Sequence, residues 1–284
     1  MAKSSFINWE NAPIKKEGFI AIFIFMSGLI GEGFYFYNRF ITFHRYSINK
    51  NYWRIGFTEA VMGGYENLGS EEIGYIMPAS ILLETEENRG INANLLWLLD
   101  GMVKLQNWTI YSEFLVDDFA LDKKSPPQIA FSAGIGKKIN NLLINIEYTR
   151  VNRWTGNYCN STPSYTMIEK NVPIGHSIGS DAQYLLINSI YTINKKLAIE
   201  TSINWMENSG GNANERLLEW PDNVPCETNF GYNNEPFPSE SHIIYHGEGK
   251  VNYLINNWIL FDFGVSLAKN NHPIFRSKIS FRLD

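Results

Sequence analysis

A histidine, a serine and an aspartate lie close together in the run NVPIGHSIGSD, residues 171–181. His176, Ser177 and Asp181 are the residue types of a nucleophilic hydrolase, in which histidine accepts the serine proton and a carboxylate orients the imidazole. A triad is recognised by its geometry, and this spacing fits no triad geometry and supplies no oxyanion hole. A hydrolase is therefore the least favoured of several functions.

Other catalytic and ligand-binding signatures are missing from the sequence. The five histidines have no metal-ligand spacing such as H-x3-H, and two cysteines cannot build a cysteine-based zinc site. There is no phosphate-binding P-loop and no G-x-G-x-x-G before a helix. We therefore expect neither a metal nor a cofactor.

Aromatic and amide side chains are frequent in the long polar segments. Flat aromatic faces suit the C–H faces of sugar rings, and planar amides suit their hydroxyl groups. Candidate saccharide contacts are Trp154, Tyr158, Tyr165, Trp220, Tyr232 and Asn233. The alternative is that these segments are ordinary polar loops.

Cys159 and Cys226 fall in two of the long polar segments. A disulfide between them is chemically allowed in an oxidising compartment. The alternative is a pair of free thiols whose Cα atoms lie too far apart to bridge.

Composition favours β-structure. A length of 284 residues allows one large domain or two small ones, and the fold predicted below makes it a single domain, 1–284. The chain is 44% hydrophobic, 19% charged and 14% aromatic, and strands favour aromatic and β-branched residues. Mean hydropathy is only -0.21, as expected when half of each strand faces a polar interior. The net charge of -5 argues against nucleic-acid binding, which needs a basic face.

Twelve segments have strand character, and several alternate between apolar and polar residues. In 196–207, for example, Leu197, Ile199, Ile203 and Trp205 share one face, because side chains alternate across a strand. The predicted strands are 18–28, 33–48, 51–63, 92–105, 107–120, 127–138, 141–154, 182–194, 196–207, 241–255, 257–269 and 273–284.

The connections between these segments alternate in length. Tight turns are predicted at 48–50, 106, 138–140, 194–195 and 256, and longer loops at 64–91, 121–126, 155–181, 208–240 and 270–272. An antiparallel, up-and-down transmembrane β-barrel has short periplasmic turns and long extracellular loops. The fold prediction is therefore such a barrel, with both termini periplasmic because the strand count is even.

Tryptophans lie near both ends of the predicted strands. Membrane barrels carry aromatic girdles at the two headgroup levels, and the predicted girdle residues are Trp53, Trp108, Trp154, Trp205 and Trp258. The opposite strand faces would line the lumen with charges of both signs, including Glu113, Glu147, Glu200 and Asp262 against Arg54, Lys250, Arg276 and Arg282. Ion pairs across the lumen would then close the interior.

The apolar run 19–30 is too short for a transmembrane helix, which needs about 20 residues. Acidic residues precede it and no A-x-A-like cleavage site follows, so a barrel strand is favoured over a signal peptide. Without a clear export signal, we expect the chain to be the C-terminal part of a longer barrel.

Four segments carry a resemblance to a known family: RIGFTEAVMGG (54–64), NLLWLLDGMVKLQNWTIYSEFLVDDF (94–119), IEYTRVNRWTGN (146–157) and NVPIGHSIGSD (171–181). From about Trp9 onward, the chain resembles the Wzi-like capsule-assembly family. The resemblance is greatest to its Bacteroidetes branch, which includes gliding-motility-associated outer-membrane proteins.

The resemblance implies a non-enzymatic outer-membrane barrel that holds or organises capsular or other surface polysaccharide at the cell exterior. Its partners would be outer-membrane lipid and that polysaccharide. The glycine-rich run would order a loop through Pro173, Gly175, His176, Gly179 and Asp181. A transport barrel for small solutes and a soluble β-protein remain as alternatives.

Overall fold

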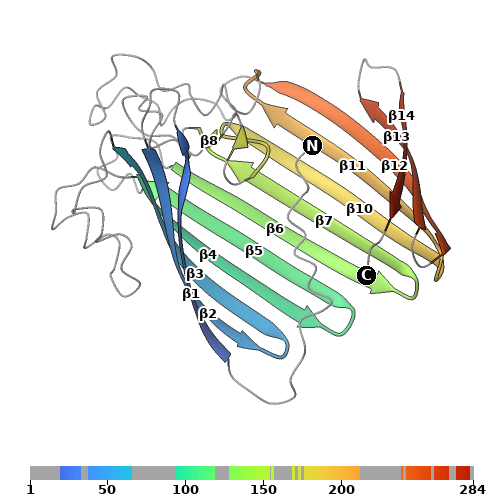
Figure 1. The fold of residues 1–284 in the computed structure, drawn as a ribbon, viewed down its shortest axis with the longest axis horizontal. Coiled ribbons are helices and arrows are strands. Elements are labelled where there is room, and N and C mark those ends of the chain that lie inside the picture. The colour runs from blue at the N-terminus through green and yellow to red at the C-terminus, as the bar shows by residue number, and fades with distance from the viewer. Residues whose placement is uncertain are drawn as a thin grey trace.

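The computed structural model describes residues 20–32, 38–65, 94–118, 128–153, 155–156, 168–169, 172–173, 176–211, 238, 241–256, 259–268 and 273–281. Twelve strands form one sheet in sequence order (Figure 1). They are β1 (Ile20–Glu32), β2 (Asn38–Lys50), β3 (Trp53–Tyr65), β4 (Asn94–Leu105), β5 (Trp108–Asp118), β6 (Gln128–Ile139), β7 (Leu142–Val151), β10 (Ala182–Asn194), β11 (Leu197–Asn208), β12 (His242–Asn256), β13 (Ile259–Ala268) and β14 (Ile274–Phe281).

All neighbouring strands of this sheet are antiparallel, which confirms the predicted fold class and the twelve predicted strands. The first tight turn is displaced, because β2 continues through Lys50 and the chain turns at Asn51–Tyr52. Sequence reasoning also missed a small hairpin between β7 and β10. It consists of β8 (Ile168–Glu169) and β9 (Val172–Pro173).

Short turns lie along one edge of the sheet, and the strand ends that the longer connections join lie along the other (Figure 1). Two of the turns require a residue in the left-handed region, Gln106 and Asn140, each with φ of 51°. The strands curl into a curved wall whose ladder begins at β1 and ends at β14, and no described pairing joins these two strands. No helix of the described chain is long and apolar enough to cross a membrane.

Across β4–β11, the outward face of this wall is apolar and exposed, whereas on β2 and β3 the same face buries Thr42, His44, Glu59 and Val61. Six residues, one from each of six neighbouring strands, are cross-strand partners in an unbroken row. Each is 37–63% exposed: Val103, Ile110, Ile135, Ile146, Ile187 and Ile203. The opposite face buries polar residues, among them Asp100, Asn145 and Thr149. Burial is thus reversed relative to a soluble domain. Apolar outside and polar inside is the arrangement of a transmembrane β-barrel wall.

A small apolar cluster lies on the inner face near the long connections. Val151, Ile178 and Ala182 are its buried members, and Ala130, Tyr184 and Met206 pack against them. Because Ile178 from the preceding loop covers this part of the wall, inward positions of β10 can be apolar there. This explains why 182–194 alternates poorly in sequence.

The two wall faces predict opposite responses to a lysine at neighbouring positions of β10. Ile187→Lys places a charge in the outward apolar row and should lower the free energy of unfolding by about 2–4 kcal/mol in lipid vesicles. Asn188→Lys is the matched control, because its side chain shares the inner face with Asn145. Guanidinium titrations would measure both, and equal losses would contradict the assignment of the faces.

Candidate functional site on the inner wall

The inner wall carries polar side chains in register across neighbouring strands. One row of opposed residues runs from β2 to β10 through Ser47, Gly56, Asp100, Glu113, Ser132, Thr149 and Tyr184. Within the row, the Ser132 and Thr149 hydroxyl oxygens are 3.0 Å apart. The candidate site consists of two clusters along this row, and each cluster is centred on a carboxylate.

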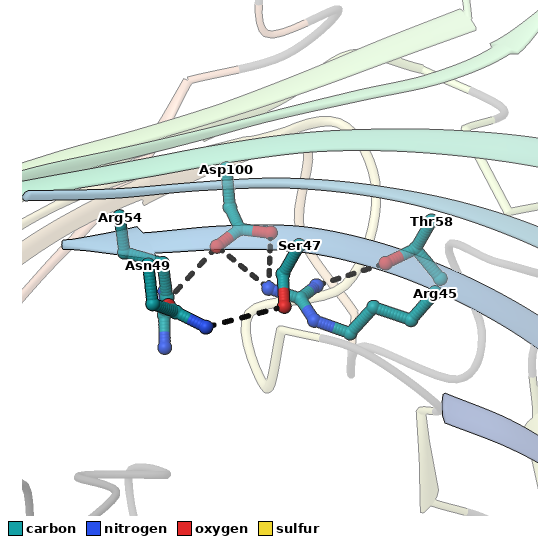
Figure 2. A network of polar contacts seen from close by, with 6 residues as sticks. All are labelled: Arg45, Ser47, Asn49, Arg54, Thr58 and Asp100. Carbon is teal, nitrogen blue, oxygen red and sulfur yellow. Dashed lines mark hydrogen bonds and ion pairs between the residues drawn. The ribbon is translucent and has the colours of Figure 1, made fainter. Parts of the chain in front are cut away.

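The first cluster joins two arginines to one aspartate (Figure 2). Arg45 Nη2 from β2 lies 2.7 Å from Asp100 Oδ2 on β4, and Arg54 Nη2 from β3 donates to Oδ1 at 3.1 Å. Arg45 Nη1 also donates to Thr58 Oγ1 at 2.9 Å. The Asp100 side chain is 4% exposed, against 24% and 19% for the two arginines. A nearly buried carboxylate is therefore compensated by two cations on the lumen side.

Gly56 makes this arrangement possible. It lies on β3 directly between Ser47 and Asp100, so Arg45 must cross it to reach β4. A Cβ atom at this position would overlap both the Arg45 guanidinium and the Asp100 carboxylate. The glycine thus lets a long side chain bridge strands that are not neighbours.

The second cluster uses the same arrangement. Tyr111 on β5 crosses Gly134 on β6, and its hydroxyl donates to Glu147 Oε2 on β7 at 2.5 Å. Asn145 Nδ2 donates to the Tyr111 oxygen at 3.2 Å. A Cβ at Gly134 would overlap the tyrosine ring. Each cluster therefore locks three strands together through one glycine.

The end of the loop before β10 folds onto the second cluster. His176 Nε2 lies 3.4 Å from Thr149 Oγ1 and 4.0 Å from Glu147 Oε1, and its ring centroid lies 6.0 Å from that of Tyr184. Ile178 N donates to His176 Nδ1 at 3.4 Å. The imidazole thus connects the loop to the inner wall.

Backbone contacts complete this loop end. Gly179, with φ of 71°, donates to His176 O, and Asp181, with φ of 51°, donates to Asn152 O. Ser209 N donates to Asp181 O, which connects the loops that follow β7 and β11. These contacts fit the predicted loop-ordering role of His176, Gly179 and Asp181, which stays a prediction. Pro173 lies in β9, and Gly175 lies outside the described residues.

A third polar group lines β11–β13. His246 contacts Asn204 Nδ2 through Nδ1 at 3.4 Å and Ser266 Oγ through Nε2 at 2.6 Å. Four residues further along β12, Lys250 lies 3.9 Å from Glu200, which also accepts from Asn252 Nδ2 at 2.6 Å. The Arg54–Asp100 and Glu200–Lys250 pairs connect neighbouring strands of one wall, whereas sequence reasoning expected pairs across the lumen.

The arrangement offers hydrogen-bond donors and acceptors to a polar solute rather than a reactive nucleophile. Ser177 is exposed, and its hydroxyl makes no hydrogen bond to the His176 ring within the described chain. Among the described residues, no three His, Cys, Asp or Glu side chains are grouped as metal ligands. The contacts of the inner wall are those of a stiffened polar surface.

The other sequence-predicted sites are only partly placed. Trp108 is exposed on the outward face at the short-turn end, and Trp53 begins β3 there. Trp205 lies near the other end, opposite Leu185 and Tyr245. Their girdle role stays a prediction. Predicted residues outside the described part are both cysteines, Trp258 and the six saccharide candidates, which include the girdle residue Trp154.

Sequence reasoning missed Arg45, Asp100 and Tyr111. They look like ordinary polar residues of alternating strands, and their partners are two strands away. The available signal was the glycine at the crossing point, Gly56 or Gly134, within an inward-facing register. That signal becomes readable only when the strand pairing is known.

Adding one methyl group at the Tyr111 crossing should disturb the second cluster. Gly134→Ala displaces the tyrosine from Glu147 and Asn145 and should lower the free energy of unfolding by about 1–3 kcal/mol. Gly247→Ala is the matched control, since a Cβ there meets nothing within 4 Å. Denaturant unfolding of both variants tests the claim, and an unaffected Gly134→Ala protein would contradict it.

Removing the shared carboxylate should cost more than removing an exposed one. Asp100→Asn leaves two guanidinium groups uncompensated and should destabilise the fold by about 2 kcal/mol, allowing for their partial exposure. Glu200→Gln, at a 40% exposed carboxylate, should cost less than about 1 kcal/mol. Unfolding midpoints in a common detergent would rank the two, and the reverse order would refute a structural role for Asp100.

Among solved structures, the fold is similar to that of Wzi from Escherichia coli, an outer-membrane protein involved in group 1 capsule assembly and a carbohydrate-binding β-barrel. Identity is 11%, the match covers 86% of this chain and 51% of Wzi, and the TM-score is 0.54. This chain therefore spans about half the length of Wzi. At this identity, the likeness concerns the fold alone, which is a Wzi-like outer-membrane barrel fold.

Two further solved structures match with lower TM-scores. The first is CymD, a monoaromatic hydrocarbon channel, with 9% identity, coverage of 92% of this chain and 75% of CymD, and a TM-score of 0.36. The second comes from work on in-meso crystallization of membrane proteins, with 6% identity, 93% and 83% coverage, and a TM-score of 0.31. No protein-family model and no curated protein matches the sequence.

Proposed function

We propose that this chain is part of an outer-membrane barrel that binds or organises capsular or other surface polysaccharide without catalysing a reaction. The long connections would face the cell exterior and both termini the periplasm. The observation that carries the proposal is the reversed burial of the wall, apolar outside and polar inside, in a Wzi-like fold. Membership in the Wzi-like family is part of the same proposal.

The loop end supports a binding role over a hydrolytic one. His176, the residue that a hydrolase would need, contacts Thr149, Glu147 and Ile178 and thereby holds the loop against the wall. Residues 176–181 thereby form a fixed base at the end of this loop. Preorganised loops suit recognition, because less conformational entropy is lost on binding.

A small-solute transport barrel is the second candidate. One observation favours it: the Glu113 carboxylate lies on the inner wall opposite Asp100 and is exposed, with no hydrogen bond or ion pair to the described chain. Such a group could meet solutes in a water-filled lumen. Planar-bilayer recordings separate the candidates, since transport predicts steady conductance that Glu113→Gln alters.

Polysaccharide retention tests the first candidate. The chain in vesicles should retain fluorescently labelled surface polysaccharide from the producing cells, and Trp154→Ala with Tyr158→Ala should weaken retention about tenfold. Tyr52→Ala is the control, because Tyr52 is an exposed aromatic residue in a short turn at the opposite edge. Equal losses in both proteins, or no retention by the parent chain, would refute the proposal.

A further inference from the structure

The short-turn edge of the sheet is strongly basic. Segments 49–54, 104–109, 137–142 and 193–198 contain no aspartate or glutamate, although the whole chain has a net charge of -5. They contain six lysines, and none of these forms an ion pair with the described chain: Lys50, Lys104, Lys137, Lys138, Lys195 and Lys196. We call these six residues the lysine rim.

Backbone hydrogen bonds make the lysine rim continuous. Lys104 N donates to Tyr52 O at 2.7 Å, and Lys138 N donates to Asn107 O at 2.9 Å. Leu254 N donates to Lys196 O at 2.7 Å. Each short turn is therefore fastened to the neighbouring strand or turn, and these turns follow one edge of the wall (Figure 1).

The lysine rim borders the outward apolar surface. Ile48, Leu105, Ile139 and Ile193 are 40–53% exposed and lie within two residues of a rim lysine. Lys137 Nζ lies 4.2 Å from the Trp108 ring centroid, and Lys50 Nζ lies 6.0 Å from that of Tyr52. Lysine stems can lie along apolar surface while the ammonium group reaches the headgroup level, where tryptophan and tyrosine also lie.

We propose that the lysine rim binds the phosphodiester headgroups of anionic phospholipids in the leaflet at the short-turn edge. Six lysines without an ion pair to the described chain line an edge whose outward side carries exposed aliphatic and aromatic side chains, which matches a ligand that has an anionic head and an apolar tail. Phosphate oxygens accept hydrogen bonds from ammonium groups. The acyl chains would lie against the exposed apolar row on the outward face of β4–β11. The inference rests on the membrane location in the proposed function, but not on polysaccharide binding.

Lipid selectivity tests this directly. The full chain is incorporated into vesicles that contain brominated phosphatidylglycerol or brominated phosphatidylcholine, and quenching of tryptophan fluorescence gives the relative binding constant of the two lipids. We expect about a threefold preference for phosphatidylglycerol. About 1 M salt should abolish it, because screening then acts within about 3 Å.

Paired substitutions locate the effect. Lys137→Gln with Lys138→Gln, or Lys195→Gln with Lys196→Gln, should each lower the preference about twofold. Lys123→Gln with Lys124→Gln is the matched control, because it removes the same charge from the connection between β5 and β6 and should leave the preference unchanged.

Three results would overturn the proposal. They are equal affinity of the parent chain for both lipids, an equal loss in the control pair, and no quenching by either brominated lipid, which would also refute the membrane location. Labelled polysaccharide retained equally by all lysine variants would show that the lipid site and polysaccharide binding are separate. Polysaccharide retention that fails while lipid selectivity persists would count against the proposed function alone.

Discussion

A strand in lipid must give every backbone N–H and C=O group a partner within the protein, because the hydrocarbon region offers none. Antiparallel pairing meets this demand for the ten strands that have a neighbour on each side in the sheet. It also fixes the two faces, since alternate side chains must point to lipid and to the interior. The exposed apolar row on the outward face and the buried polar residues of the opposite face both follow from that constraint.

The same constraint shapes the inner wall. Polar residues placed on the inside must find partners there, and two glycines allow side chains to reach across a strand for them. Arg45 passes Gly56 to Asp100, and Tyr111 passes Gly134 to Glu147. Each crossing side chain ties three consecutive strands together, so the inner wall is stiffened by side chains as well as by backbone hydrogen bonds. The loop end at His176 then rests on an already ordered surface.

Much of the architecture could be predicted from the sequence, because strand alternation and the lengths of connections are local features. Both the twelve strands and the alternation of short and long connections are confirmed. The polar clusters could not be predicted, since Arg45 and Asp100 meet only through the register of three strands. The poor alternation of β10 also needed the structure, because Ile178 from a loop changes what its inner face contacts.

The central claim is that one face of the wall meets lipid and the other faces a polar interior. Spin labels at single cysteines along β10, from Ile187 to Thr192 in a chain with Cys159 and Cys226 replaced by serine, would test this most directly. In lipid vesicles, collision with dissolved oxygen should peak at the odd positions and collision with a water-soluble nickel chelate at the even ones. Equal accessibility at odd and even positions would contradict the two-faced wall.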